Sequence, residues 1–265
     1  MSWSAPEVAE PSGPPRLRVA TYNIHKGVRG VGPAKRLEIH NLGLGVEAFD
    51  ADLVFLQEVR LFHHREARRF NRVLLGWPDR GQAEYLAPEG YEVAYRTNAV
   101  TRDGEHGNAL LSRWPIGSEI GHHDVSDHRF EQRGLLHVPV HWEGVEIHAI
   151  VVHFGLMHAS RVRQALRLGA YLHERVPPGA PLVVAGDFND WGERLDPVMA
   201  AVGLRRARAP QAEIWPRTFP SRSPVFALDR VYTRGLHCQA TLVPRGAIWA
   251  RMSDHLPLVV DLALA

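Results

Sequence analysis

The chain has little of several features that would narrow its class. It has one cysteine, Cys238, in 265 residues, which excludes an internal disulfide and any zinc or iron–sulfur site built from several thiolates. The formal net charge is only +2 at pH 7, so the charge balance requires no polyanionic partner. No apolar run reaches transmembrane length, and residues 1–7 lack the basic and apolar regions of a secretory signal. We therefore expect a soluble, cytoplasmic protein without a transmembrane segment.

The composition changes only once along the chain. Residues 1–15 contain four prolines together with Ser, Gly and Glu, a composition that predicts a disordered leader. Residues 16–265 show no repeat, low-complexity segment or linker, and the chain is 45% hydrophobic. We therefore expect one domain over residues 16–265.

Apolar strand-like runs in this sequence repeatedly stop at polar residues. The alternation of Leu17, Val19 and Thr21 predicts a strand that leads to Asn23. Three further runs end at Glu58, His153 and Asp187 (residues 52–56, 145–152 and 181–185). Helices are expected over residues 34–49, 62–75, 160–176 (with Ser160 as N-cap) and 194–202, and a loop over 77–89.

Residues 184–192 carry the strongest chemical signal. Asp187 and Asn189 follow a buried strand and point the same way, because alternate residues of an extended segment share a face. A carboxylate can activate water or hold a hard cation, and a carboxamide can orient its partner. Read alone, Gly-Asp-Phe-Asn-Asp is also an ordinary turn sequence. The remainder of the chain must decide between the two interpretations.

Further candidates stand at other predicted strand boundaries. Asp229 follows the apolar run 225–228, and Asp254 with His255 precedes the closing strand. Glu58 is either a metal ligand or a surface acid, and Asn23 is either a site residue or a turn asparagine. His122 and His123 are adjacent and face opposite sides of a strand, which favours solvated histidines over a zinc site.

The assembled residue types favour one kind of chemistry. If the strand ends converge, carboxylates, carboxamides and imidazoles share one site, and no serine or cysteine stands in a nucleophile-elbow setting. Carboxylate and amide oxygens suit Mg²⁺ or Mn²⁺. Imidazoles beside such a cation suit attack of water on a phosphate, whose developing charge they stabilise.

Six short motifs occur in the order found in the endonuclease/exonuclease/phosphatase (deoxyribonuclease I-like) superfamily, which the chain resembles over residues 16–265. They are Thr-Tyr-Asn-Ile (21–24), Gln-Glu-Val (57–59), Gly-Asn-Ala-Leu-Leu-Ser-Arg (107–113), Gly-Asp-Phe-Asn (186–189), Leu-Asp-Arg-Val (228–231) and Ser-Asp-His (253–255). The chain is most similar to small bacterial members whose substrates are unassigned. The resemblance implies an α+β fold, a four-layer α/β/β/α sandwich in which helices flank two packed, mostly antiparallel β-sheets.

The resemblance also implies a role for each candidate residue. Glu58 resembles the main ligand of Mg²⁺ (with Mn²⁺ as a substitute), helped by Asn23 and Asp254. Asp187 resembles the residue that orients or deprotonates the attacking water, assisted by Asn189. His255 resembles the group that stabilises the transition state or acts as general acid, and Asp229 the carboxylate that orients it. His153 is similar to a histidine that contacts the scissile phosphate, and Arg133 and Asn108 to groups that bind the substrate phosphate.

The substrate class stays open between three hypotheses. The first is a phosphodiester of nucleic acid, favoured by Arg60, Arg133 and the arginine cluster at residues 205–208. The second is a phospholipid head group or a small phosphate ester, for which Trp77, Trp215, Phe219 and Trp249 would form an apolar rim. The third is a non-catalytic binding module on the same fold. No protein partner is implied.

Overall fold

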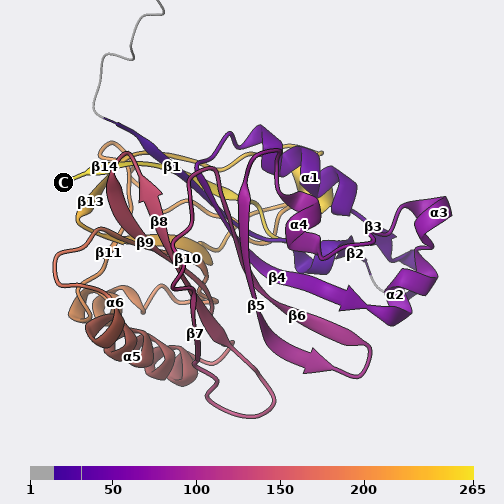
Figure 1. The fold of residues 1–265 in the computed structure, drawn as a ribbon, viewed down its shortest axis with the longest axis horizontal. Helices are drawn as coiled ribbons and strands as arrows, with labels where there is room; N and C mark the ends of the chain where they lie inside the picture. The colour runs from indigo at the N-terminus through magenta and orange to yellow at the C-terminus, as the bar shows by residue number, and fades with distance from the viewer. Residues whose placement is uncertain (1–14, 31) are drawn as a thin grey trace, which may run out of the picture.

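The computed structural model describes residues 15–30 and 32–265, which fold around two six-stranded sheets (Figure 1). The leader predicted for residues 1–15 lies, apart from Pro15, outside the described residues. Within the described part of the chain, no helix is both long enough and apolar enough to cross a membrane.

The first sheet has the strand order β13-β14-β1-β4-β6-β5. Strands β1 and β4 run parallel, and all other neighbours in this sheet are antiparallel. The predicted strand at residues 17–21 is therefore confirmed as a central strand. The bounds are β1 (Leu17–Asn23), β4 (Leu53–His63), β5 (Glu92–Thr101), β6 (Gly104–Ser112), β13 (Leu236–Leu242) and β14 (Leu258–Leu264).

The second sheet has the strand order β11-β12-β10-β9-β8-β7. Here β9 and β10 are the parallel pair, and the other neighbours are antiparallel. The bounds are β7 (Gly121–Asp124), β8 (Gly134–Trp142), β9 (Val145–His153), β10 (Leu182–Asp187), β11 (Arg205–Arg206) and β12 (Asp229–Arg234). A separate small ribbon pairs β2 (Val28–Arg29) with β3 (Arg36–Leu37).

The two large sheets pack face to face, and helices cover their outer faces. Apolar residues of both sheets, among them Phe55 and Val151, form the central core. Because central strands bury side chains on both faces, their sequences are nearly continuous apolar runs. On the first sheet lie α1 (Ile39–Ala48), α4 (Gln82–Leu86) and α7 (Trp249–Met252), and on the second α5 (His158–Arg175) and α6 (Asp196–Ala201). The expected α/β/β/α sandwich is confirmed.

Several predicted helix boundaries differ from the structure. Helix α1 begins at Ile39, because residues 36–37 pair with β2 instead of entering the helix. The helix expected over residues 62–75 is two, α2 (His64–Arg69) and α3 (Arg72–Leu75), and the expected loop at 77–89 contains α4. Ser160 is not an N-cap, because α5 already begins at His158; the Ser160 hydroxyl instead donates to Asp127 at 2.7 Å.

Candidate active site

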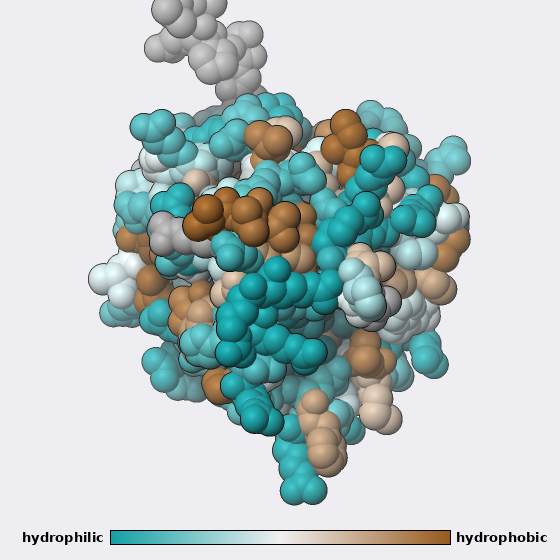
Figure 2. All heavy atoms as spheres, turned by 90° about the vertical axis from the view of Figure 1, so that its right-hand side faces the viewer, coloured by the Kyte–Doolittle hydropathy of each residue, from teal (hydrophilic) through white to brown (hydrophobic). Residues whose placement is uncertain are grey.

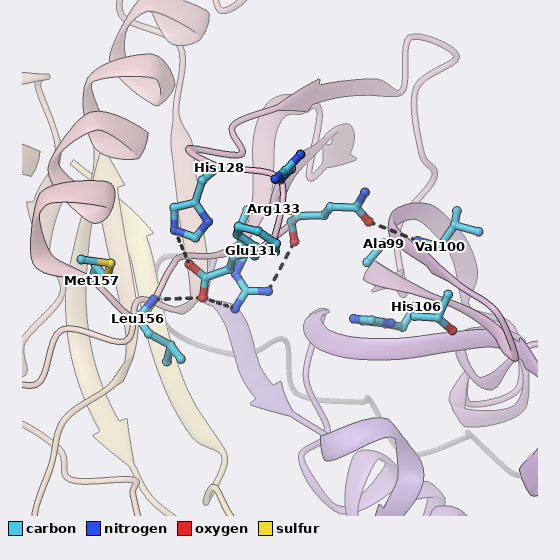
Figure 3. A pocket seen from close by; sticks show the side chains of 12 residues that line it. Ala99, Val100, His106, His128, Glu131, Arg133, Leu156 and Met157 are labelled. Carbon is cyan, nitrogen blue, oxygen red and sulfur yellow. Dashed lines mark hydrogen bonds and ion pairs between the residues drawn. The ribbon is translucent and has the colours of Figure 1, made fainter.

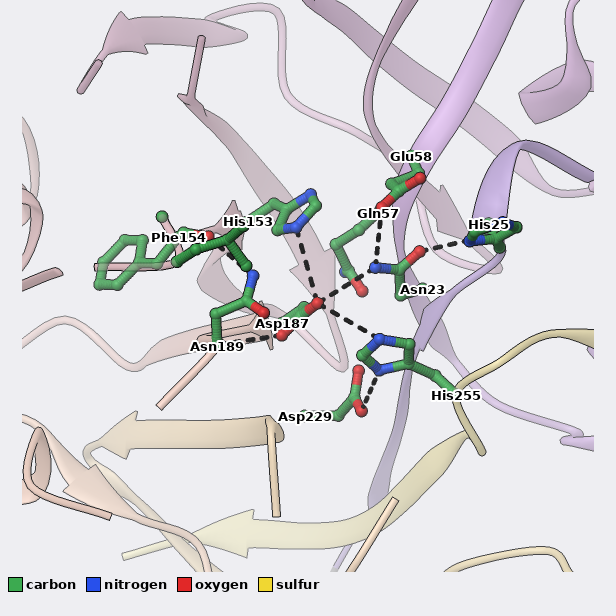
Figure 4. Close-up of polar contacts among 12 residues, drawn as sticks. Asn23, His25, Gln57, Glu58, His153, Phe154, Asp187, Asn189, Asp229 and His255 are labelled. Carbon is green, nitrogen blue, oxygen red and sulfur yellow. Dashed lines mark hydrogen bonds and ion pairs between the residues drawn. The ribbon is translucent and has the colours of Figure 1, made fainter. Parts of the chain in front are cut away.

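The polar ends of several strands meet at one edge of the sandwich (Figure 4). Parallel pairing of β9 with β10 aligns His153 with Asp187, and antiparallel pairing of β10 with β12 places Asp229 opposite Asp187. From the other sheet, Asn23 at the end of β1 donates its amide to Asp187 Oδ2 at 3.1 Å. The last residue of one strand thus contacts the last residue of a strand in the facing sheet.

Asp187 lies at the centre of this cluster and is buried. Its Oδ2 is 3.6 Å from His153 Nε2 and 3.6 Å from His255 Nε2, and its Oδ1 accepts a hydrogen bond from the backbone N–H of Asn189 at 2.9 Å. Burial raises the pKa of Asp187 to about 6, against the opposing charge of His255. At neutral pH the group is a carboxylate with an unusually high proton affinity, as a general base requires.

The backbone at Gly186 makes this placement possible. A Cβ atom at this position would lie 1.8 Å from the carbonyl oxygen of Val152 in the neighbouring strand β9. Only glycine allows the two strands to approach so closely, and the approach sets Asp187 beside His153.

His255 is held as an imidazolium. Its Nδ1 donates to Asp229 Oδ2 at 2.8 Å, and both side chains are buried. Burial alone would lower the pKa of His255, but the charges of Asp229 and Asp187 outweigh it and raise the pKa to about 10. Phe219 packs against the imidazole ring with centroids 4.8 Å apart.

His153 has the opposite electrostatic character. Burial, reinforced by the charge of Arg133, lowers its pKa well below the ordinary value, so the ring is neutral. The two imidazoles that flank Asp187 therefore differ in charge. Asn189 leaves the extended conformation of β10, because its φ is +49°. Its side-chain amide donates to the carbonyl of Phe154, the residue that follows His153, at 2.9 Å.

Glu58 reaches the cluster by a backbone irregularity. The sequence predicts that the strand ends at Glu58, and this is wrong, because β4 continues to His63. The pairing register with β6 shifts between Leu56 and Val59, and Glu58 has a φ of +57°, which marks a β-bulge. Glu58 Oε1 accepts a hydrogen bond from Asn23 Nδ2 at 3.4 Å.

Two basic residues that the sequence analysis missed face the acidic groups. The turn η1 (His25–Gly27) has positive φ at all three residues, 46°, 61° and 69°. It sets Lys26 Nζ 3.0 Å from Glu58 Oε2 and His25 Nδ1 3.3 Å from Asp254 Oδ1. Burial would raise the pKa of Glu58, but Lys26, with His153 and His25, holds it well below the ordinary value. The signal was available, because Asn-Ile-His-Lys-Gly directly follows the first strand.

Two groups of side chains are possible metal ligands. Ligand atoms of Asp187, Asp229 and His255 lie within 4.8 Å of one another. The imidazolium of His255 has no lone pair for a metal, however, and its proton already joins it to Asp229. Asn23, Glu58 and Asp254 offer only oxygen ligands, and the buried Oε2 of Glu58 already has a cationic partner, the ammonium of Lys26 at 3.0 Å. The second group therefore fits a hard divalent cation better.

Arg133 and Asn108 lie next to the cluster. Arg133 donates to Glu131 at 3.0 Å and, at 3.3 Å, to the same Phe154 carbonyl that Asn189 contacts. It lines a cavity of about 640 Å³ together with His106, Phe130 and Leu156 (Figure 3). The Asn108 amide is buried between the sheets and donates to the carbonyls of Gly134 (2.9 Å) and Val151 (3.3 Å). Contacts of either residue with a substrate phosphate stay a prediction.

Comparison with known proteins agrees with this fold. The Endonuclease/Exonuclease/phosphatase family matches residues 20–255, and the chain belongs to that family. It is 36% identical over 256 residues to the uncharacterized protein YbhP of Escherichia coli (strain K12). The aligned region covers 94% of this chain and 96% of YbhP.

Solved structures share the fold at low sequence identity. A mannosyl-6-phosphatase of Bacteroides thetaiotaomicron superposes with a TM-score of 0.67 at 19% identity, over 94% of this chain and all of its own. A humanized TDP2 of D. rerio superposes with a TM-score of 0.64 at 14% identity, over 93% of this chain and 98% of its own. At these identities the likeness establishes the fold alone.

Proposed function

We propose that the protein is a divalent-cation-dependent hydrolase that cleaves a phosphodiester by attack of water activated by Asp187. One observation carries the proposal: the Asp187 carboxylate stands between two imidazoles of opposite protonation state, each 3.6 Å from the same oxygen. A base flanked by a neutral and a charged hydrogen-bond donor suits in-line attack on a phosphate, where a proton is removed while negative charge develops.

The chain's own residues divide the work as follows. Asp187 takes the proton from water, and the Asn189 N–H and the Asn23 amide fix the orientation of its carboxylate. His153, being neutral, donates a hydrogen bond to a phosphate oxygen. His255, held charged by Asp229, stabilises the developing charge. With a pKa near 10 it keeps its proton at neutral pH. It can therefore stabilise the developing charge, or give its proton to the leaving alkoxide as the P–O ester bond breaks and the water oxygen bonds to phosphorus.

Glu58, Asn23 and Asp254 would hold Mg²⁺ or Mn²⁺. When bound, the ion supplies Lewis-acid stabilisation of charge on the phosphate. The all-oxygen ligand set supports this assignment, as does the Glu58 carboxylate, whose Oε2 already accepts a cationic partner, Lys26, at 3.0 Å.

For the substrate, nucleic acid is supported by fewer groups than the sequence suggests. Arg60 is buried and paired with Glu66, and Arg206 pairs with Asp196 at 3.3 Å while stacking on Trp215. Neither guanidinium is therefore directed to a ligand. The remaining support is the cavity of about 640 Å³ beside the cluster, whose lining includes Arg129 and Arg133.

Hydrolysis of a phospholipid head group is the second candidate. The apolar rim predicted for it is formed in part: Trp77 stacks on Phe70 and Trp249 on Phe49, away from the candidate site, whereas Phe219 packs against His255. A different apolar surface, on α3, favours this candidate and is described below.

The test uses two substrates, supercoiled plasmid and the small diester bis(p-nitrophenyl) phosphate, with Mg²⁺ present. Asp187→Asn should abolish hydrolysis of whichever substrate the parent cleaves, while Asp50→Asn, an exposed carboxylate paired with Arg113, should leave it unchanged. Full activity in a folded Asp187→Asn variant would refute the mechanism. If a parent that binds metal cleaves neither substrate, a phospholipid head group or another small phosphate ester becomes the favoured substrate. A parent that binds no divalent cation would favour the non-catalytic hypothesis.

A further inference from the structure

The segment between β4 and β5 exposes aliphatic side chains that no packing within the fold explains. Val73, Leu74 and Leu75, the last three residues of α3, are 89%, 80% and 55% exposed. Figure 2, which faces the side of the molecule where α3 lies, shows hydrophobic side chains gathered in a band bordered by hydrophilic ones. Three consecutive exposed aliphatic residues are unusual on a protein surface and indicate a binding function.

The segment does not need these residues for its own folding. Phe70 and Trp77 are buried and stacked, with ring centroids 6.1 Å apart and an interplanar angle of 5°, and Val28 packs with them. This small core already anchors the segment to the rest of the fold. The exposed aliphatic residues of α3 are therefore not part of this small core.

The ends of α3 fix the exposed residues in place. Asn71 caps the first turn, its side chain accepting a hydrogen bond from the Val73 N–H at 2.9 Å. Gly76 ends the helix in the left-handed conformation with a φ of +74°. The aliphatic side chains are thus presented by a short, capped turn.

Basic residues lie on the helix that precedes the exposed aliphatic residues. Helix α2 carries Arg65, Arg68 and Arg69 on exposed positions, and its one acidic residue, Glu66, is buried and paired with Lys35 and Arg60. Burial, then the charges of Arg60, Lys26, Arg69 and Arg65, lower the pKa of Lys35. We name this surface the α2–α3 tip: Arg65, Arg68, Arg69, Val73, Leu74 and Leu75.

We propose that the α2–α3 tip docks on an anionic phospholipid bilayer. The aliphatic side chains enter the boundary between head groups and acyl chains, and the arginines contact lipid phosphates. A nucleic acid would engage the arginines but offers no acyl layer to aliphatic residues, because bases stack on aromatic rings. Charge and apolar character together therefore favour a membrane.

The test is co-sedimentation of the full-length protein with vesicles of phosphatidylcholine, with and without phosphatidylglycerol. Binding to the anionic vesicles should fall about tenfold or more in Leu74→Ser/Leu75→Ser, because the apolar part of the docking surface is lost. Arg65→Glu/Arg68→Glu should weaken binding in a salt-dependent manner. Leu74→Met/Leu75→Met should bind like the parent, because side-chain apolarity rather than shape is required.

The matched control is Leu44→Ser/Leu166→Ser, which removes two leucines that are 65% and 54% exposed on other helices and should leave binding unchanged. Equal binding by the tip and control variants, or no binding by the parent, would overturn the proposal. So would an oligonucleotide affinity that depends on the tip arginines without vesicle binding, or a dimer that Leu74→Ser/Leu75→Ser dissociates. No hydrolysis is measured, so the result is independent of the proposed activity.

Discussion

Asp229 and His255 form a buried, directly hydrogen-bonded ion pair, with His255 Nδ1 2.8 Å from Asp229 Oδ2. The pair joins the first residue of β12 to the segment before β14, in the other sheet. Because burial alone would lower the pKa of His255, the imidazolium depends on its carboxylate neighbours, Asp229 first among them. The charge state of His255 is thus set across the interface between the sheets.

Replacing Asp229 should therefore act through His255. We expect Asp229→Asn to lower the pKa of His255 and to reduce kcat by about 10²-fold or more, the usual range for loss of electrostatic stabilisation of a transition state. An NMR titration of the imidazole in the metal-free protein measures the first effect. An unchanged pKa in the folded variant would contradict the assignment of charge.

The stability of the metal-free protein should fall at alkaline pH. The folded pKa of His255 is raised to about 10, above its ordinary value of 6.5, so the folded state binds this proton more tightly than the unfolded state. The associated stability is complete below about pH 6.5 and is lost as the pH rises through about 10. Urea unfolding between pH 7 and 10 in EDTA tests this. In His255→Gln the decline should be smaller, and an equal decline in both proteins would refute the linkage.

Activity should rise through mildly acidic pH. Asp187 must be ionised to accept a proton, and its pKa is raised to about 6 by burial. We expect kcat/KM to increase through about pH 6 and to level off above pH 7, since kcat/KM reports the free enzyme. A profile that is flat from pH 5 to pH 8 would assign the base to another group.

Lys26 should weaken metal binding, because its ammonium lies 3.0 Å from Glu58 Oε2 and repels a cation. We expect Lys26→Met to tighten Mn²⁺ binding about tenfold, equivalent to about 1.4 kcal/mol, and Glu58→Gln to weaken it strongly. Isothermal titration calorimetry measures both. Lys35→Met serves as control, since Lys35 pairs with Glu66 instead. Equal affinities in Lys26→Met and the control would refute repulsion by Lys26, and an unchanged affinity in Glu58→Gln would show that Glu58 is not a ligand.

Asn108 should matter for stability. Its amide donates to carbonyls of β8 and β9 from β6 and so joins the two sheets. Asn108→Ala leaves two buried carbonyls without this donor, and we expect a loss of about 1–3 kcal/mol in the free energy of unfolding. Chemical denaturation measures it. Asn98→Ala, a partly buried asparagine of β5, should cost less.

The sequence by itself determined which chemical groups stand at strand boundaries. Apolar runs that end at Asn23, His153 and Asp187 indicate buried strands with polar ends, because a group that must meet solvent or substrate cannot interrupt a buried strand. The two-sheet fold was implied by the resemblance to the endonuclease/exonuclease/phosphatase superfamily, but the buried strands and the position of Asp187 at a strand end could be predicted in this way. Local patterning suffices here because burial and periodicity are properties of consecutive residues.

Only the tertiary structure decided the surroundings of these groups. The bulge at Glu58 and the left-handed turn that carries Lys26 depend on partners far along the chain. The burial of Arg60 and Trp77 depends on how Glu66 and Phe70 fold onto them. The sequence does not distinguish an arginine that faces solvent from one that, like Arg60, pairs with Glu66. An arginine's charge is neutralised only where the tertiary structure places an acidic partner beside it. For the same reason the sequence indicated the candidate reacting groups, and the fold determined their charge states.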